Sequence, residues 1–245
     1  MFPDVLRGRE LFDQFSDTTR ESLRAAARPC ALACGEVLFR QDDRADAAYL
    51  IREGKIKITT RTESCTPYDR RETLLSLYGP GNVLGEDGIC DGGRQPVTAT
   101  AVTDCVLDRV ARADLEAIMM ADASAERVLA HHLARRLHVA KVLIATNSDL
   151  DVPTRTALTI LILVSRFGEP TSTGVYVYHG LTQTELASMM GASREAFNKA
   201  ITEFARRSWI RIATKSFVAL DLPRLTARAG LAPDQGPRLQ SQSAW

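Results

Sequence analysis

The spacing of apolar residues changes near residue 111, and this change divides the chain into segments that must fold differently. From about residue 29 to residue 110, apolar and polar residues alternate in short runs punctuated by glycines: EVLFRQ, AAYLIREG, KIKITTRT, RETLLSLY, NVLGE, VTATAVT and CVLDRV. A period of two is typical of half-buried strands, and many short strands favour a β-sandwich or a barrel-like roll. We therefore expect a β-roll, preceded by helical segments within residues 9–27.

Helical spacing returns between residues 112 and 148, where a short helix leads into a long one from about Ser124 to Thr146. The long helix has two apolar stripes, the first of Leu129, Leu133, Leu137, Ala140 and Ile144 and the second of Val128, His132, Arg135, Val139 and Val142. A helix that packs only on its own domain needs one stripe. The second stripe predicts contact with the same helix of a homodimer, and the alternative is an ordinary central helix of a monomer.

A domain junction is expected at NSDLDVPTR, because Asp151 is a good helix N-cap and Pro153 suits the first turn of the next helix. That helix is predicted to end at Gly168, with a loop at EPTSTG and a strand at VYVYHG. After residue 231 the sequence APDQGPRLQSQSAW is rich in Pro, Gln and Ser, which is typical of a disordered tail.

Residues 181–212, LTQTELASMMGASREAFNKAITEFARRSWIRI, predict two helices joined by a glycine turn. Thr182 and Glu185 have the spacing of a capping box at the start of the first helix. Gly191 permits a left-handed turn, and Ser193 can cap the second helix. Helix, turn and capped helix together form a helix-turn-helix unit, while the alternative is a helical hairpin with a solvated charged face.

The polar face at the start of the second helix carries residue types that suit the major groove of DNA: Arg194, Glu195, Asn198 and Lys199. Arginine can bond guanine, glutamate can accept from cytosine, and asparagine can read adenine or hold a phosphate, as lysine can. WIRIATKSFVAL then predicts two short strands with a turn near Lys215, forming a wing that can touch the DNA backbone.

Charge is distributed unevenly along the chain. Residues 1–150 contain 20 Lys and Arg against 23 Asp and Glu, whereas residues 151–231 contain 10 against 6, a balance of +4 in a chain whose net charge is +1. The positive charge therefore belongs to the part that carries the helix-turn-helix pattern. No apolar run reaches the roughly 18 residues of a membrane helix, and no signal peptide is recognisable, so a cytoplasmic protein is expected.

The cysteines and histidines do not form a recognisable metal or disulfide pattern. Five cysteines are scattered through the chain, at Cys30, Cys34, Cys65, Cys90 and Cys105. We interpret them as free thiols, with a metal site or a redox-sensing thiol as alternatives. Adjacent His131 and His132 point about 100° apart on a helix and are interpreted as structural. No Walker, HExxH or GxSxG motif occurs, so an enzyme is not expected.

Taken over residues 9–231, this order of segments resembles the Crp/Fnr superfamily: an α+β chain with an N-terminal β-roll, a long central dimerisation helix and a C-terminal winged helix-turn-helix. DVPTRTALTILILVSRFG and the helix-turn-helix sequence look like the actinobacterial cyclic-AMP receptor protein regulators. The sequence patterns place domains at 1–111, 112–150 and 151–231, with the tail at 232–245. The resemblance implies a homodimer that binds near-palindromic double-stranded DNA and RNA polymerase. It assigns Arg194, Glu195 and Lys199 to base reading and Thr182, Gln183 and Ser193 to phosphates.

The resemblance also identifies GEDGICDGGRQPVTATA as a phosphate-binding cassette that departs from the family pattern. Gly85 and Glu86 match its start, but the family's Arg and Ser positions fall on Pro96 and Val97, and Pro offers neither charge nor N–H. Arg94 lies two residues early and reaches the anion only if the loop is rearranged.

On the central helix, the family's polar adenine contacts fall on Ala140 and Lys141. Weak or no ordinary cyclic-AMP dependence is therefore expected, with Arg94 and Lys141 as candidates for a substitute anion site. The alternatives are ordinary cyclic-AMP control, a redox-sensing regulator that uses Cys90, and a cyclic-nucleotide-binding module of a signalling protein.

Overall fold

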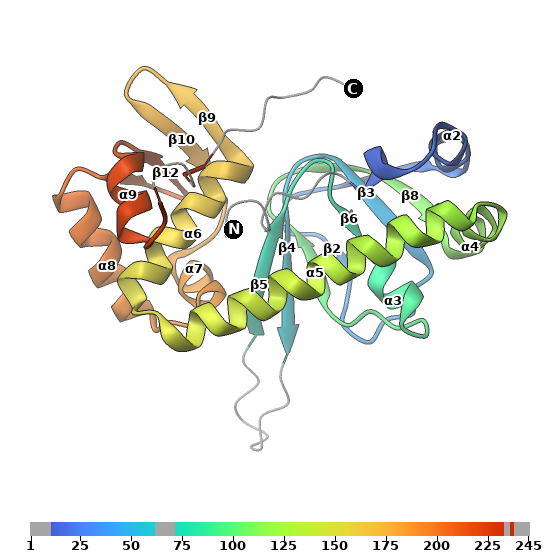
Figure 1. Cartoon of the computed structure of the whole chain (residues 1–245), viewed down its shortest axis with the longest axis horizontal. Coiled ribbons are helices and arrows are strands. Elements are labelled where there is room, and N and C mark those ends of the chain that lie inside the picture. The colour runs from blue at the N-terminus through green and yellow to red at the C-terminus, as the bar shows by residue number, and fades with distance from the viewer. Residues whose placement is uncertain (1–10, 62–71, 233–235, 238–245) are drawn as a thin grey trace. The chain divides into compact units, whose positions relative to one another are not determined.

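The computed structural model describes residues 11–61, 72–232 and 236–237 (Figure 1). The chain divides into two compact units, one within residues 8–137 and the other from His138 onward. The long helix α5 (Ala123–Asp149) runs from the first unit into the second. It confirms the predicted long helix and extends three residues further at its C-terminal end. The domain boundaries at residues 111, 150 and 231 remain a prediction, and the expected tail lies almost wholly outside the described residues.

The first unit is built on two four-stranded sheets whose strands all pair antiparallel. One sheet has the order β1 (Arg28–Leu32), β8 (Cys105–Ala111), β3 (Ala47–Glu53), β6 (Val83–Leu84). The other has the order β2 (Val37–Phe39), β7 (Thr98–Ala101), β4 (Ile56–Arg61), β5 (Glu72–Tyr78). Both sheets contribute to one apolar core, which includes Ile51 and Leu107 from the first and Ile56 and Ala99 from the second. This confirms the predicted β-roll.

Helices cover a second apolar cluster of the same unit. The 3₁₀ helix η1 (Phe12–Gln14), α2 (Asp17–Ala26), α4 (Arg112–Ala121) and the start of α5 bury Phe12, Leu23, Leu115 and Met119 together. The Asp122 carboxylate joins these helices, because it accepts hydrogen bonds from Thr19 Oγ1 at 2.6 Å and from Ser124 Oγ at 2.6 Å. The β-roll therefore holds the first part of α5 through packed helices.

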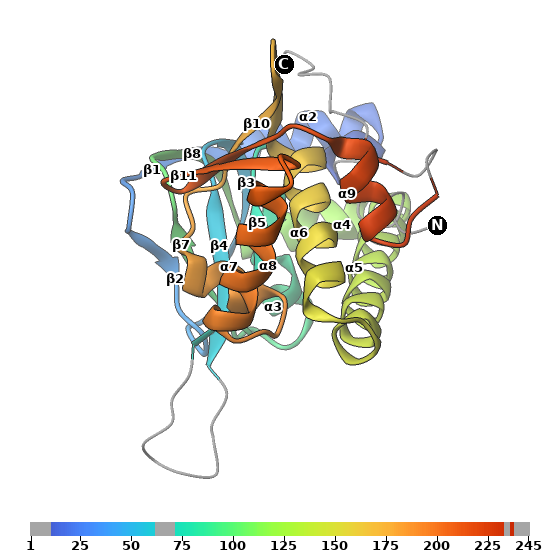
Figure 2. The ribbon, with the colours of Figure 1, turned by 90° about the vertical axis from the view of Figure 1, so that its left-hand side faces the viewer.

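Within the described residues, the second unit consists of the C-terminal part of α5, four further helices and a four-stranded sheet. The helices are α6 (Val152–Phe167), α7 (Gln183–Met189), α8 (Arg194–Arg206) and α9 (Leu222–Arg228). The sheet has the order β11 (Ile210–Ala213), β12 (Ser216–Ala219), β10 (Gly174–Tyr178), β9 (Gly168–Thr171). Helix α6 packs against both α8 and α9 (Figure 2). Asp151 caps α6, and α6 ends before Gly168, as the sequence predicts.

Three elements differ from the expectations. EPTSTG was expected to be a loop, but β9 pairs with β10, and β1 was not predicted at all. Both are edge strands that contain a proline, Pro170 and Pro29, and an edge strand tolerates the missing N–H that would exclude proline from a central strand. The predicted strand NVLGE is shortened to β6, because Gly85 turns the chain at φ 85° into the short helix α3 (Glu86–Cys90).

Among the described residues, no helix is long and apolar enough to cross a membrane.

Candidate DNA-binding surface and ligand cassette

The two helices of the predicted helix-turn-helix are capped by their own side chains. Thr182 Oγ1 accepts a hydrogen bond from the Glu185 N–H at 3.2 Å, and Glu185 Oε2 accepts from the Thr182 N–H at 2.7 Å. Ser193 Oγ accepts from the Ala196 N–H at 3.1 Å at the start of α8. The capping box and the serine cap are thus confirmed, and each cap satisfies backbone donors that would otherwise lack partners.

The turn between these helices is fixed by glycine and by backbone bonds. Gly191 has φ 61°, a left-handed conformation that residues with a Cβ adopt at a cost. The Gly191 N–H bonds to the Ser188 carbonyl, and the Ala192 N–H to the Ala187 carbonyl, both at 3.0 Å. Helix α8 then buries one face, Phe197, Ala200, Ile201 and Phe204. Its opposite face is left for solvent or a ligand.

The structure places all the predicted DNA-contacting residues in the second unit. Six of them are exposed at the starts of the two helices or on the first turns of α8: Thr182, Gln183, Ser193, Arg194, Glu195 and Lys199. Lys215 is exposed in the turn between β11 and β12, with φ 54°. Asn198 differs from the others, because its side chain is half-buried and its Oδ1 lies buried without a hydrogen-bond partner among the described residues.

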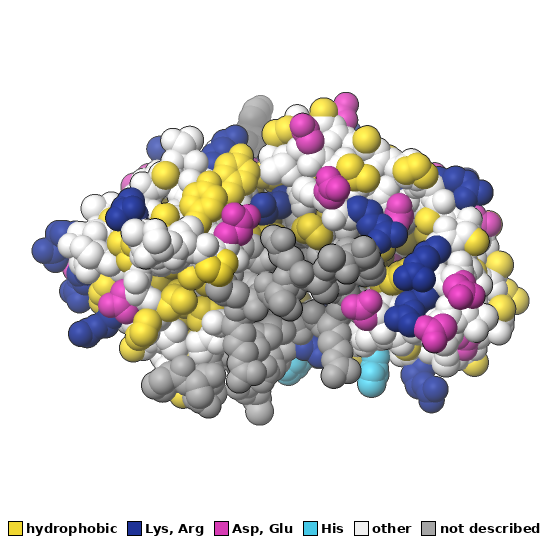
Figure 3. Space-filling model, turned by 90° about the horizontal axis from the view of Figure 1, so that it is seen from above, with side chains coloured by type: hydrophobic (Ala, Val, Ile, Leu, Met, Phe, Trp, Pro, Cys, Tyr) yellow, Lys and Arg dark blue, Asp and Glu magenta, His cyan; other side chains and the backbone are white. Residues whose placement is uncertain are grey.

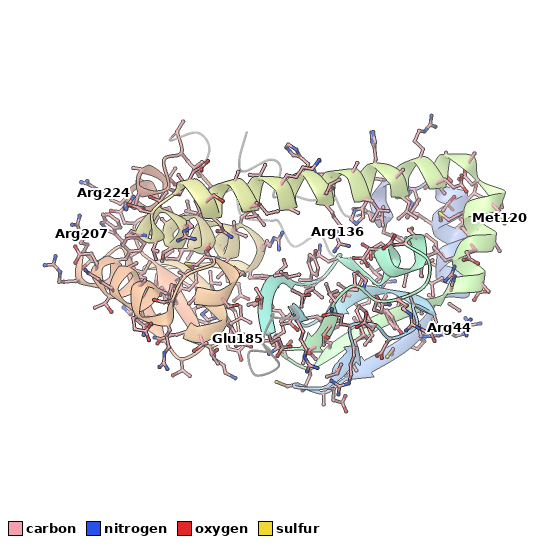
Figure 4. The ribbon with its side chains drawn as sticks, turned by 90° about the horizontal axis from the view of Figure 1, so that it is seen from below. Arg44, Met120, Arg136, Glu185, Arg207 and Arg224 are labelled. Atoms are coloured by element: carbon pink, nitrogen blue, oxygen red, sulfur yellow. The ribbon has the colours of Figure 1, made fainter. Side chains whose placement is uncertain are left out.

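The C-terminal end of α8 carries a second charged group that the sequence reasoning missed. Arg206 and Arg207 both donate to the Glu203 carboxylate, Arg207 at 2.5 Å. Arg207, which is labelled in Figure 4, also lies over the Trp209 ring at 5.4 Å. The hydrogen bonds from these two arginines lower the pKa of Glu203 to about 2. Lys and Arg side chains also gather at the outer edge of this unit, on the left in Figure 3.

The cassette lies where β6 meets α3. A Cβ at Gly85 would lie 2.7 Å from the Ala47 carbonyl oxygen, so only glycine fits this position without a shift. Glu86 follows with only 1% of its residue surface exposed. Its carboxylate is ion-paired with Arg136, which extends from α5 toward α3 in Figure 4, and His132 Nε2 lies 3.4 Å from the same oxygen.

Burial opposes the charge on Glu86, but the contacts with His132 and Arg136 outweigh it and hold the pKa of Glu86 below its usual range. Arg136 is further fixed by a 3.0 Å hydrogen bond to the Tyr78 hydroxyl. For the adjacent Asp87, burial and the neighbouring Glu86 charge raise the pKa. The carboxylate at the start of the cassette is therefore already neutralised by a cation of the same chain, which sequence spacing alone did not identify.

Arg94 and Lys141, the residues predicted to form a substitute anion site, are both exposed. Arg94 is exposed, and its Nη1 donates to the Asp42 carbonyl at 2.7 Å. Pro96 is exposed too, while the intervening Gln95 is buried at 2% exposure against α3. Lys141 is exposed on the part of α5 that belongs to the second unit. A site that joins Arg94 and Lys141 remains a prediction.

The described cysteines, Cys30, Cys34, Cys90 and Cys105, are free thiols, and Cys65 lies outside the described residues. Burial, followed by the charges of Glu86 and Asp87, raises the pKa of Cys90 at the end of α3. A raised pKa lowers the fraction of reactive thiolate. Within the described part of the chain, no group of three metal-binding side chains occurs.

A β-roll with a cassette, followed by a long helix and a winged helix-turn-helix, defines a transcription regulator with a cyclic-nucleotide-type sensor domain. A family model of the cyclic nucleotide-binding domain matches residues 29–122, and one of the Crp-like helix-turn-helix domain matches residues 154–228. The chain belongs to the Crp/Fnr family of transcription regulators.

Individual relatives agree with this assignment. A CRP-like cAMP-activated global transcriptional regulator of Mycobacterium tuberculosis is 34% identical over 92% of this chain and 99% of its own length. The cyclic AMP receptor protein of Thermus thermophilus is 29% identical over 73% of this chain and 77% of its own length. The structure of FixK2 from Bradyrhizobium japonicum shares the fold, with a TM-score of 0.74 at 18% identity, over 84% of this chain and 98% of that one.

Proposed function

We propose that this regulator binds near-palindromic double-stranded DNA as a homodimer and reads it through α8. The observation that carries the proposal is the exposure of Arg194, Glu195 and Lys199 on the first turns of a helix whose other face is buried. Arg194 would bond guanine, Glu195 would accept from cytosine N4, and Lys199 would contact a base or a neighbouring phosphate. We further propose a cytoplasmic location, RNA polymerase as a partner and no enzymatic activity.

The remaining predicted residues would position the protein on the DNA backbone. Thr182 and Gln183 at the start of α7 and Ser193 at the start of α8 would contact phosphates, since helix N-termini present backbone N–H groups to anions. Lys215 would bring the wing to the backbone. Asn198, because it is half-buried, would need to rotate before it could contact a base or a phosphate.

Dimerisation through α5 would place two recognition helices on one DNA molecule. Leu137 is 56% exposed and Ile144 is 67% exposed, and both belong to the predicted first stripe of α5. Large apolar residues at such exposure along one helix face are typical of an interface with another subunit. Two α8 helices about one turn of DNA apart would match a two-fold symmetric site.

We also propose that DNA binding depends weakly or not at all on cyclic AMP. The Mycobacterium tuberculosis relative is named as cAMP-activated. In this chain, however, Pro96 and Val97 stand where the resemblance places the anion-binding Arg and Ser, and Arg94 is bonded to the Asp42 carbonyl. A missing charge-assisted contact of this kind costs about 2–5 kcal/mol, or more than tenfold in affinity.

The test is the fluorescence anisotropy of purified full chain on a DNA site selected from a random pool, over a range of salt and with or without cyclic AMP. We expect affinity that falls steeply with salt, because bound phosphates release counterions, and that cyclic AMP leaves unchanged. Tight cyclic-AMP binding, or a cyclic-AMP-dependent gain in affinity, would refute the ligand proposal while leaving the DNA proposal intact.

Arg194→Ala tests the recognition helix, with Arg206→Ala on the same helix as the matched control. Loss of a bidentate base contact costs about 1–3 kcal/mol of discrimination, so the preference for the selected site over random DNA should fall about 5- to 150-fold for Arg194→Ala. Arg206→Ala removes one of two arginines bonded to Glu203 and should change the preference less than twofold. An equal loss of site preference in the two variants would mean that Arg194 does not read DNA bases as proposed.

Thiol control is the second candidate function, because Cys90 is an exposed thiol within the cassette. Its raised pKa argues against reactivity near neutral pH. The same binding assay under oxidising and reducing conditions decides the question, with Cys90→Ser as the control. Affinity that changes with oxidation in the wild type, but not in Cys90→Ser, would establish thiol control.

A further inference from the structure

Arg155, in the first turn of α6, bonds to two other elements of the second unit. Its Nη1 donates to the Asn147 carbonyl at 3.1 Å, to the Met190 carbonyl at 2.8 Å and to the Gly191 carbonyl at 3.3 Å. Asn147 lies in the last turn of α5, and Met190 and Gly191 form the end of α7 and the turn of the helix-turn-helix. One guanidinium nitrogen therefore meets both the end of the central helix and the turn before the recognition helix.

Asn147 lies in the last turn of α5 and Met190 is the C-cap of α7, so these two carbonyls lie at helix ends, whereas the Gly191 carbonyl belongs to the turn that follows. The last carbonyls of an α-helix have no N–H to accept from, and together they carry the negative end of the helix dipole. The ends of α5 and α7 both present such carbonyls to Arg155. A cation between two helix C-termini relieves the repulsion between them, and a neutral side chain in its place would not.

Packing around the guanidinium restricts the turn further. A Cβ at Gly191 would lie 3.5 Å from Arg155 Nη1 and 3.7 Å from the Asn147 Nδ2, in ordinary van der Waals contact, so both side chains lie close to the turn. Arg155 Nε is buried without a hydrogen-bond partner among the described residues, so the guanidinium is held by the three carbonyl contacts. Thr156, fully buried beside it, lies 3.5 Å from the Met190 sulfur.

We infer that Arg155 is a positioning residue that fixes the helix-turn-helix turn to the C-terminal end of the central helix, and thereby sets the orientation in which α8 meets DNA. Ser193, the cap of α8, is only two residues beyond Gly191, so displacement of the turn displaces Arg194 and Glu195. The inference rests on the proposed DNA-reading function of α8 for its consequence, but the contact itself is testable without DNA.

The first experiment measures hydrogen–deuterium exchange of the free full chain for Arg155→Gln. We expect faster exchange at the amides of the Gly191 turn and at the last turn of α5. The matched control is Arg228→Gln. Arg228 also bonds the start of α6, through Asp151 and Thr154, but these bonds involve neither the end of α5 nor the end of α7. Arg228→Gln should leave exchange at the Gly191 turn unchanged, even where it lowers the melting temperature.

The second experiment measures binding to a selected DNA site and to random DNA. Loss of the charged hydrogen bonds should lower the specific affinity of Arg155→Gln by about tenfold, with non-specific affinity changed less than twofold, because the phosphate-contacting side chains remain. Arg155→Lys, which keeps the charge without the fork of donors, should restore part of the specific affinity. Arg228→Gln should retain the wild-type ratio.

Unchanged exchange at the Gly191 turn in Arg155→Gln would overturn the inference, and so would an equal effect in Arg228→Gln. Either result would do so regardless of the measured DNA affinities. If the exchange effect is found but the wild-type chain binds no DNA, the positioning contact stands and the proposed function fails. If exchange changes and the ratio of specific to non-specific affinity does not, Arg155 orders the turn without setting the orientation of α8, and the inference is also overturned.

Discussion

At the scale of single residues, Glu86 is the group whose chemistry depends most on its neighbours. It is 1% exposed, it is paired with Arg136, and only one of its oxygens has partners among the described residues. A carboxylate in such a position stays ionised because partners in the same chain, here His132 and Arg136, favour its charged form. The start of the cassette thus contains an internal ion pair between Glu86 and Arg136.

Glu86→Gln should destabilise the first unit by about 2–3 kcal/mol at pH 7, because it leaves the half-buried Arg136 charge with only the Asp87 carboxylate, 3.8 Å away, as a counter-ion. The pKa of Glu86 is lowered in the folded state, so its stabilising contribution is complete above the ordinary carboxyl range and is lost as the pH falls below about 4.5. The difference in unfolding free energy between wild type and variant should shrink accordingly, as measured by urea unfolding followed by circular dichroism.

Asp87→Asn is the control for this prediction. The pKa of Asp87 is raised, so its ionisation opposes folding, and the neutral variant should equal the wild type or exceed it slightly at pH 7. A Glu86→Gln variant as stable as the wild type at pH 7 would show that the ion pair contributes nothing to the fold.

At the scale of elements, the sequence predicts best where local chemistry decides the structure. The caps at Asp151, Thr182 and Ser193 were predicted because each satisfies backbone groups only a few residues away. Edge strands β1 and β9 were missed because their strand character comes from a partner strand, not from their own composition.

Contacts between distant residues explain what the sequence left open at the candidate sites. Arg136 and Glu86 are 50 positions apart, and Arg155 and Met190 are 35 apart. No spacing rule joins such pairs, since only folding brings them together. The half-buried state of Asn198 has the same origin, because helical spacing alone placed it on the exposed face of α8.

Asp151→Asn tests how the start of α6 is fixed. Asparagine caps a helix as well as aspartate, so the variant keeps the bond to the Thr154 N–H and loses only the charge that faces Arg228. The pKa of Asp151 is lowered to about 2, first by the hydrogen bond with Thr154. Its stabilisation should therefore be present above about pH 4 and be lost as the pH falls toward 2.

Because the Asp151 side chain is 61% exposed, we expect the charge to contribute less than about 1 kcal/mol at pH 7. Urea unfolding of wild type and Asp151→Asn at pH 7, 5, 3 and 2 measures it, and the two curves should converge at the lowest pH. A loss of stability in Asp151→Asn that is larger at pH 2 than at pH 7 would contradict the assigned role of the Asp151 charge. Asp151→Ala, which also removes the helix cap, should lower the free energy of unfolding by about a further 1 kcal/mol.

At the scale of the whole molecule, charge and apolar surface are segregated along the chain. The positive balance lies in the part that carries the helix-turn-helix, whereas the β-roll part is slightly negative. Large exposed apolar side chains lie on α5, which runs through both units. Non-specific attraction to DNA would therefore act on the second unit, and assembly would act on the helix that both units share.

The proposed dimer is tested by Leu137→Glu combined with Ile144→Glu, which places two charges on the exposed stripe of α5. Sedimentation should show a monomer where the wild type is a dimer, because buried, unpaired charges oppose association. DNA affinity for a two-fold site should fall at least about 100-fold, since the second half-site is no longer bound intramolecularly. Met120→Glu is the control: Met120 is 84% exposed but lies at the end of α4, so this variant should remain dimeric. A double variant that sediments as a dimer would exclude α5 as the interface.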